Sequence, residues 1–147
     1  MQARKRSGTR SAANSTSKPP EPLTFFLDES LDGASVVAAL RHAGALVERL
    51  TEHFQRGTPD EVWLSHAGQR GWIVLTRDKR IRYRQLERLA LQAAKVRAFV
   101  FTGGNVTVKD TAAALVNALP RMSKIARADH GPFIYHLGRS GKPRRMD

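Results

Sequence analysis

Residues 72–83, with the sequence WIVLTRDKRIRY, join an apolar run to a single acid and then to a series of basic residues. The run WIVLT (72–76) shows no alternation of polar and apolar residues, which is typical of a strand buried on both faces of a sheet. Asp78 follows this strand almost at once. Parallel sheets bind ligands beyond the carboxyl ends of their strands. The sequence therefore predicts a buried parallel strand with a functional acid at its end.

The rest of the chain alternates between strand and helix patterns. Further apolar runs predict strands over 23–27, 45–50, 97–102 and 132–137. Apolar residues at helical spacing predict helices over 33–44, 58–71, 82–95 and 107–127. Strands that alternate with helices form a parallel sheet covered on both faces. We therefore expect an α/β fold, a three-layer sandwich with a central, mostly parallel five-stranded sheet of the Rossmann-like type.

The composition is strongly basic and fits one domain. The 147 residues contain 25 Lys or Arg against 13 Asp or Glu, a formal charge of +12, which favours polyanionic partners and nucleic acid above all. There is no cysteine, which excludes disulfides and thiolate metal sites. No run of residues approaches the ~20 apolar residues that span a bilayer. We therefore expect a cytoplasmic protein with no membrane partner.

The two ends of the chain differ in composition from the middle. Residues 1–22 hold five Lys or Arg among Ser, Thr, Asn and Pro, and we expect them to form a disordered basic tail. Residues 138–147, GRSGKPRRMD, have the same character and are expected to form a loose basic C-terminal tail. The folded domain is then expected over 23–137. The tails either keep the chain in solution or attach it weakly to nucleic acid.

Several acids gather at one edge of the predicted sheet. Those that follow a strand, or begin the helix before one, are Asp28, Glu29, Glu52, Asp60, Glu61 and Asp78, and His53 stands next to Glu52 as a further possible metal ligand. Carboxylate oxygens suit Mg²⁺, which typically combines one or two carboxylates with several waters. Crowded carboxylates without a cation repel one another, so we expect one of them to have a raised pKa. We also expect Asp78→Asn to stabilise the metal-free protein.

These acids also have structural explanations. The segment TPDE (58–61) has the form of a capping box, with Thr58 as the N-cap and Glu61 at the third helical position. Asp60 would then only complement the helix dipole. Asp28 could cap the following helix, and Asp78 could form a turn with its basic neighbours. The pattern alone leaves metal binding and these local roles open.

A run of arginines follows Asp78. If residues 80–94 continue as one helix, Arg80, Arg84 and Arg88 lie four residues apart on one stripe, while Leu86 and Leu89 face the sheet. Such a stripe is either a solvated face or a surface that binds phosphates. We expect a nucleic-acid-binding surface, to which the residues next to Asp78 also belong. Its members are Arg77, Lys79, Arg80, Arg84 and Arg88.

Four segments of the chain resemble a known family in their order and spacing. They are FFLDES (25–30), GTPDEVW (57–63), GWIVLTRDKRIRY (71–83) and AFVFTGG (98–104). The chain is similar here to the PIN-like domains related to VapC-type toxin ribonucleases, over about residues 24–137. The resemblance implies a metal-dependent endoribonuclease, the toxin of a toxin–antitoxin system, which hydrolyses RNA phosphodiesters. An antitoxin protein and a homodimer are the partners that it implies.

The resemblance also implies a site. Asp28, Asp60 and Asp78 correspond to the catalytic acids that hold Mg²⁺ or Mn²⁺ in such enzymes, and Glu29 to a further metal ligand. Many members carry another acid two positions after the TRD aspartate, where this chain has Arg80. That departure leaves open whether one or two metal ions bind.

Two other classes of function remain open. A receiver-like phosphoacceptor domain uses an acid pair after its first strand, an aspartate after its third and a hydroxyl after its fourth, which Asp28, Glu29, Asp78 and Thr102 could supply. Receivers also need a lysine beyond the fifth strand, and the sequence offers only Lys142 in the predicted tail. A non-catalytic nucleic-acid-binding module is the third class, supported by charge alone. Asp28→Asn separates the classes, since plain polyanion binding would survive it.

Overall fold

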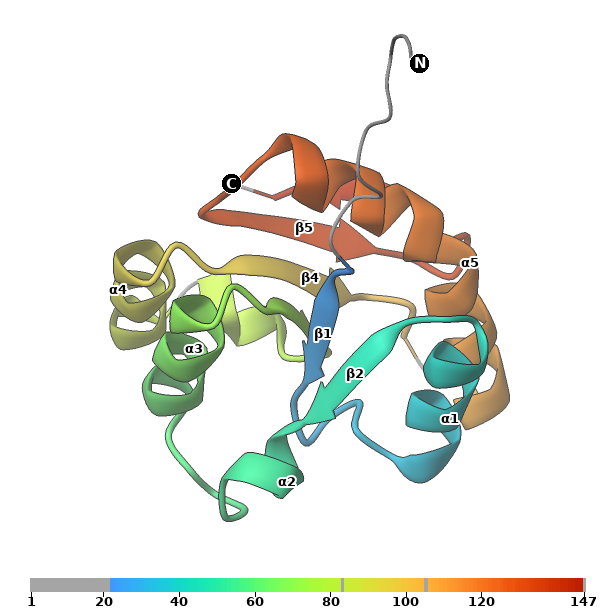
Figure 1. Cartoon of the computed structure of the whole chain (residues 1–147), viewed down its shortest axis with the longest axis horizontal. Coiled ribbons are helices and arrows are strands. Elements are labelled where there is room, and N and C mark those ends of the chain that lie inside the picture. Colours follow the sequence, from blue (N-terminus) through green and yellow to red (C-terminus); the bar gives the residue numbers. More distant parts are fainter. Residues whose placement is uncertain (1–21, 83, 105, 147) are drawn as a thin grey trace, which may run out of the picture.

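The computed structural model describes residues 22–82, 84–104 and 106–146 (Figure 1). Its strands are β1 (Thr24–Leu27), β2 (Leu46–Arg49), β3 (Ile73–Thr76), β4 (Arg97–Phe101), β5 (Phe133–Leu137) and β6 (Pro143–Arg145). Its helices are α1 (Ala34–His42), α2 (Leu50–His53), α3 (Asp60–Gln69), the short 3₁₀ helix η1 (Lys79–Arg82), α4 (Gln85–Ala93) and α5 (Val108–Ala128). Strands and helices alternate along most of this chain, as the sequence predicted.

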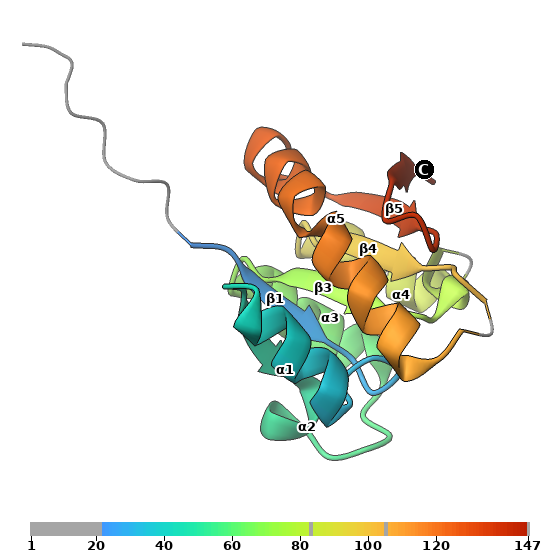
Figure 2. The same cartoon turned by 90° about the vertical axis from the view of Figure 1, so that its right-hand side faces the viewer.

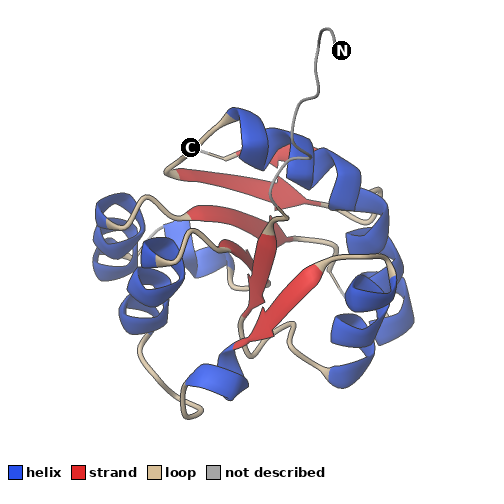
Figure 3. Ribbon diagram, viewed as in Figure 1, coloured by secondary structure: helices blue, strands red, loops and turns tan. Residues whose placement is uncertain are grey.

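The strands form one sheet in the order β2-β1-β3-β4-β5-β6 (Figure 3). Strands β1 to β5 pair in parallel, whereas β6 runs antiparallel to β5. The predicted α/β sandwich with a mostly parallel central sheet is confirmed. Because β1 and β3 are neighbours, the residues that follow them, Asp28 and Asp78, meet at the same edge of the sheet.

Two apolar layers cover the two faces of the sheet. Phe25 and Leu27 of β1 belong to the layer under α1 and α5, whereas Phe26 between them belongs to the layer under α3 and α4. Figures 1 and 2 show these helix pairs on opposite sides of the strands. Strand side chains alternate between faces, so a strand buried on both faces must be apolar throughout. This explains the unbroken apolar runs of the sequence.

The predicted strand count was one too low, because β6 lies in the segment 138–147 that was expected to be a loose tail. Its pairing with β5 joins Leu137 to Pro143 and Tyr135 to Arg145. An edge strand needs only backbone partners, and Pro and Arg are common at sheet edges, so no apolar run marks it. The other predicted tail, residues 1–22, lies outside the described residues except for Pro22.

The capping box predicted at residues 58–61 is wrong. Helix α3 begins at Asp60 with Pro59 as its N-cap, which offers no side-chain oxygen. The hydroxyl of Thr58 instead donates to the carbonyl oxygen of Gln55 at 2.6 Å. Asp60 and Glu61 do lie in the first turn, where their charges favour the helix dipole.

The helix predicted over 82–95 is interrupted. Arg84 has an extended backbone (φ −75°, ψ 126°), and this separates η1 from α4. The interruption turns α4 so that Leu86 and Leu89 are 65% and 54% exposed, whereas Glu87 is buried. Arg80, Arg84 and Arg88 therefore do not form the continuous stripe expected from one helix.

Among the described residues, none of the helices combines the length and the apolar character that a membrane span needs.

Candidate active site at the carboxyl ends of β1 and β3

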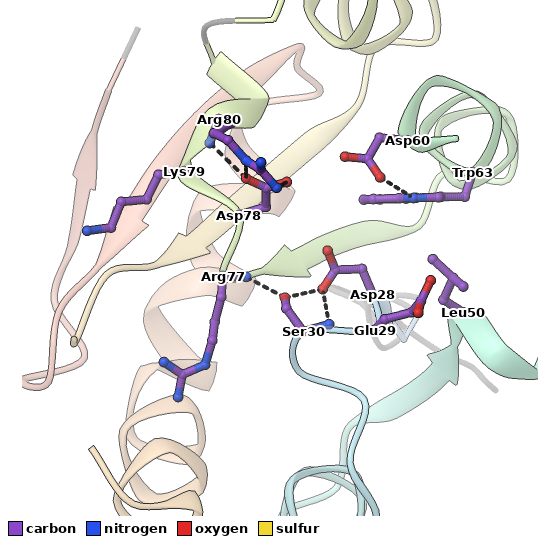
Figure 4. A pocket seen from close by; sticks show the side chains of 10 residues that line it. All are labelled: Asp28, Glu29, Ser30, Leu50, Asp60, Trp63, Arg77, Asp78, Lys79 and Arg80. Atoms are coloured by element: carbon purple, nitrogen blue, oxygen red, sulfur yellow. Dashed lines mark hydrogen bonds and ion pairs between the residues drawn. The ribbon is translucent and has the colours of Figure 1, made fainter. Parts of the chain in front are cut away.

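A pocket of about 530 Å³ opens at the carboxyl ends of β1 and β3, beside the start of α3 (Figure 4). The residues that line it are Asp28, Glu29, Ser30, Leu50, Asp60, Trp63, Arg77, Asp78, Lys79 and Arg80. The structure thus brings together Asp28, Asp60 and Asp78, and Figure 4 shows their carboxylates turned toward a common space. Strands β1 and β3 bring Asp28 and Asp78 there, and the first residue of α3 adds Asp60.

Asp28 is held by two hydroxyl groups. Its Oδ1 accepts hydrogen bonds from the Ser30 hydroxyl and, at 3.0 Å, from the Ser30 backbone N–H. Its Oδ2 accepts one from Thr76 Oγ1 at 2.5 Å. The same hydroxyl oxygens accept hydrogen bonds from the backbone N–H groups of Arg77 and Asp78, at 2.8 and 3.0 Å. Ser30 and Thr76 therefore connect Asp28 to the backbone that carries Asp78.

Burial dominates the protonation of Asp28, whose exposed fraction is 7%. It raises the pKa of this carboxyl to about 6, against the lowering effect of the hydrogen bonds from Ser30 and Thr76. The charge of Asp60 contributes a further, smaller increase in that pKa. Within the described part of the chain, no Lys, Arg or His forms an ion pair with Asp28. Among the described residues, this buried carboxylate is therefore stabilised by hydrogen-bond donors and not by an ion pair.

Asp60 is oriented by a neighbour one turn along α3. Its Oδ1 accepts a hydrogen bond of 3.0 Å from the indole Nε1 of Trp63 (Figure 4). Trp63 is itself buried in the layer under α3, so its ring has a fixed position. This bond turns Asp60 toward the pocket.

Asp78 is bound by Arg80. The backbone N–H and Nε of Arg80 both lie 3.0 Å from Asp78 Oδ1, and its second guanidinium nitrogen lies 3.3 Å from Oδ2. Partial burial alone would raise the pKa of Asp78, but the hydrogen bonds and charge of Arg80 outweigh burial and lower it. As the side chains stand, no three acidic or His side chains of the described residues are arranged to hold one metal ion.

Glu29 lines the pocket but is engaged on its rim. Its Oε2 lies 3.3 Å from a guanidinium nitrogen of Arg56, and its Oε1 accepts a hydrogen bond of 3.1 Å from the backbone N–H of Gly57. These contacts tie the loop after β1 to the loop before α3. They give Glu29 a structural role at the rim of the pocket.

The predicted nucleic-acid-binding residues lie in different surroundings. Arg77 donates to Thr111 Oγ1 at 2.7 Å and lies over the ring of Phe101, so its guanidinium points away from the acids toward α5. Lys79 lines the pocket and is exposed, as is Arg88 on α4. Arg84 forms an ion pair of 3.3 Å with Glu87. Arg77 is therefore anchored, whereas Lys79 and Arg88 are accessible.

The sequence analysis missed Glu87 as a neighbour of the site. This residue is only 4% exposed, and its pKa is raised first by burial and then by the charge of Asp60. The continuous helix expected over residues 80–94 did not point to Glu87, because the break at Arg84 was not foreseen. One feature of the sequence could have drawn attention to it: Glu87 is the single acid between Asp78 and Asp110.

Glu52 and His53 do not line the pocket. Glu52 Oε1 accepts a hydrogen bond of 3.0 Å from the backbone N–H of Arg49, at the start of α2. His53 Nε2 lies 2.7 Å from Glu48 Oε1, and its ring packs beside Phe26. Both residues have local partners away from the three aspartates.

Comparison with known proteins finds a matching family model and a similar curated protein. A family model described as "PIN like domain" matches residues 23–103, which include all three pocket aspartates. The relative is "Putative ribonuclease VapC45" from Mycobacterium tuberculosis, which is 29% identical over 115 residues, covering 76% of this chain and 83% of the relative. No solved structure matches the chain.

Proposed function

Because the chain belongs to the PIN-like domain family, we propose that it is an endoribonuclease that hydrolyses RNA phosphodiesters with Mg²⁺ or Mn²⁺ bound at Asp28, Asp60 and Asp78. The observation that carries this proposal is the convergence of the three aspartates on one pocket at the carboxyl edge of the sheet. The name of the mycobacterial relative, a ribonuclease, supports RNA as the substrate.

The donor set fits a hard divalent cation. Carboxylate oxygens are its preferred protein ligands, and Asp28 is a buried carboxylate that forms no ion pair among the described residues. Binding at Asp78 requires side-chain rotation, because both carboxylate oxygens of Asp78 accept hydrogen bonds from Arg80. When bound, the cation supplies the charge that polarises a phosphate oxygen and activates water for in-line attack.

The residues of the chain then have separate tasks. Ser30 and Thr76 hold Asp28 in one orientation, and Trp63 holds Asp60. Lys79 is exposed at the pocket, and Arg88 is exposed on α4. Both are proposed to contact RNA phosphates. Binding through such contacts weakens steeply with salt. Glu29 is proposed as a further ligand only if it releases Arg56 and Gly57.

We further propose that the chain is the toxin of a toxin–antitoxin pair and acts on RNA in the cytoplasm. An acidic antitoxin segment would neutralise the basic rim formed by Lys79, Arg80 and Arg88 and block the pocket. A homodimer is also proposed, by analogy with the family. Expression of the parent protein should slow growth, whereas the Asp78→Asn variant should not. Equal toxicity of the two would contradict the toxin assignment.

The cleavage assay uses purified protein and a labelled RNA with Mg²⁺, Mn²⁺ or EDTA. Asp28→Asn, Asp60→Asn and Asp78→Asn should each reduce metal-dependent cleavage by orders of magnitude. Asp110→Asn is the matched control, because Asp110 is an exposed acid in the first turn of α5. Cleavage that survives all three pocket substitutions, at equal purity, would overturn the proposal. Retained RNA binding without cleavage in the parent would favour a non-catalytic nucleic-acid-binding module.

The receiver-like alternative has less support. Thr102 Oγ1 donates to the carbonyl oxygen of Leu137 at 3.2 Å, and Thr102 is not among the residues that line the pocket. Lys142 lies in the turn between β5 and β6 and is absent from that lining as well. Neither of the two residues that the sequence offered for these receiver-like roles therefore lies beside Asp78 in the described pocket.

A further inference from the structure

The three pocket aspartates differ in their partners. Asp28 is held by hydroxyl groups, and Asp60 by an indole N–H. Asp78 is paired with a full positive charge, and both of its carboxylate oxygens accept hydrogen bonds from Arg80. A cation that used Asp78 as a ligand would have to displace this guanidinium.

Arg80 has little else to hold it. Its side chain is 65% exposed, and within the described residues both of its side-chain hydrogen bonds go to Asp78. Asp60 and Glu87 also stabilise its positive charge, after Asp78. The guanidinium therefore lies in the field of several acids, where a bound cation would also be stabilised. An exposed ion pair of this kind is weak, so it can open easily.

We propose that Arg80 is the internal counter-ion of this pocket: it neutralises Asp78 in the metal-free protein, is displaced from Asp78 by a divalent cation, and then binds a phosphate of the RNA. This inference rests on the proposed function. It assigns Arg80 two successive partners, so that metal binding makes a phosphate-binding group available.

Metal affinity gives the first test. Mn²⁺ binding is measured from the loss of the free Mn²⁺ spin-resonance signal, for the parent and for Arg80→Ala, Arg80→Lys and Lys79→Ala. Removal of the competing guanidinium should tighten Mn²⁺ binding about two- to fivefold, which is the range expected for an exposed ion pair. Arg80→Lys should fall between the parent and Arg80→Ala, since it keeps the charge but loses the paired hydrogen bonds. Lys79→Ala is the matched control, because Lys79 lines the same pocket and forms no ion pair with the described acids. It should change affinity less than Arg80→Ala.

RNA affinity gives the second test, with an oligonucleotide in which a methylene group replaces the bridging 3′ oxygen of each phosphate, so that water attack has no oxygen to expel. Arg80→Ala should weaken binding severalfold in Mn²⁺ and hardly at all in EDTA, where Arg80 is engaged with Asp78. Lys79→Ala should weaken binding equally in both conditions. Equal Mn²⁺ affinity in the parent and Arg80→Ala, or an Arg80→Ala defect that is the same with and without Mn²⁺, would overturn the counter-ion role and leave the proposed nuclease intact. Failure of every variant and of the parent to bind Mn²⁺ would overturn the proposed metal-dependent function itself.

Discussion

Thr76 Oγ1 donates a hydrogen bond of 2.5 Å to Asp28 Oδ2 and accepts one of 3.0 Å from the backbone N–H of Asp78. One buried hydroxyl thus sets the positions of two candidate metal ligands on neighbouring strands. A threonine that ends a fully apolar strand has no packing reason to be polar. Its role is to connect the two acids.

Thr76→Val should therefore destabilise the protein and disturb the site together. The substitution keeps the shape of the side chain but removes the hydrogen-bond donor of Asp28 Oδ2 and the acceptor of the Asp78 N–H, at a cost of about 1–3 kcal/mol in the free energy of unfolding. Chemical denaturation measures this cost, with Thr102→Val as the control on the neighbouring strand end. A Thr76→Val protein as stable as the control would show that the hydroxyl is dispensable.

The pH dependence of stability should report Asp28. Its pKa is about 6 in the folded protein, against a usual value of 3.8. Between these values the folded state binds more protons than the unfolded chain, so the free energy of unfolding falls as pH rises through this window. The loss should be at most about 3 kcal/mol. Denaturation in EDTA should show the decline in the parent and a flatter profile in Asp28→Asn, which should be the more stable of the two at neutral pH. Parallel profiles would contradict this account of Asp28.

The expected stabilisation by Asp78→Asn is replaced by the one predicted for Asp28→Asn. The sequence indicated that crowded acids would raise one pKa, and the acid affected is Asp28, mainly because it is buried. The pKa of Asp78 is lowered, because Arg80 neutralises it. Asp78→Asn would remove that pair, so we expect no gain in metal-free stability from it. A local guanidinium contact of this kind depends on the backbone conformation of residues 78–80, which composition does not encode.

Glu87→Gln should weaken metal binding without unfolding the protein. Glutamine can still accept the hydrogen bond from Arg84. The substitution removes the buried carboxylate of Glu87, whose pKa is raised by burial and by the nearby charge of Asp60. We expect Mn²⁺ affinity to fall severalfold, because the pocket loses negative potential, while metal-free stability is unchanged or slightly higher. Glu61→Gln, next to Asp60 on α3, is the control for loss of charge. If the two variants bind Mn²⁺ equally well, Glu87 contributes nothing particular to the site.

Gly141→Ala tests the strand that the sequence did not predict. Gly141 has a φ of +75°, and an added Cβ would lie 3.0 Å from Asn117 Nδ2 and 3.1 Å from the Ala114 carbonyl oxygen on α5. The substitution should cost about 1–2 kcal/mol in the free energy of unfolding, through the left-handed backbone and the close approach. Gly138→Ala is the control, because nothing lies within 4 Å of its added Cβ. Equal stability of the two variants would indicate that residues 138–146 do not pack as described.

The sequence was sufficient for the parallel sheet and for the positions of Asp28 and Asp78. Strands buried on both faces carry unbroken apolar runs, and the ends of parallel strands meet at one edge, so both inferences follow from local patterns. The short edge strand β6 was not predicted, because it pairs with β5 through backbone hydrogen bonds that leave no pattern in the sequence. The orientation of α4 was not predicted, because the extended residue Arg84 separates η1 from α4, in which Glu87 is buried.

The most direct test of the proposed site is a crystal structure of the protein soaked in Mn²⁺, with anomalous scattering recorded at a wavelength that identifies manganese. We predict a manganese peak bounded by the carboxylates of Asp28, Asp60 and Asp78, with the Arg80 guanidinium turned away from Asp78. A crystal with no manganese peak in this pocket, in which Asp78 still pairs with Arg80 at saturating Mn²⁺, would contradict the account.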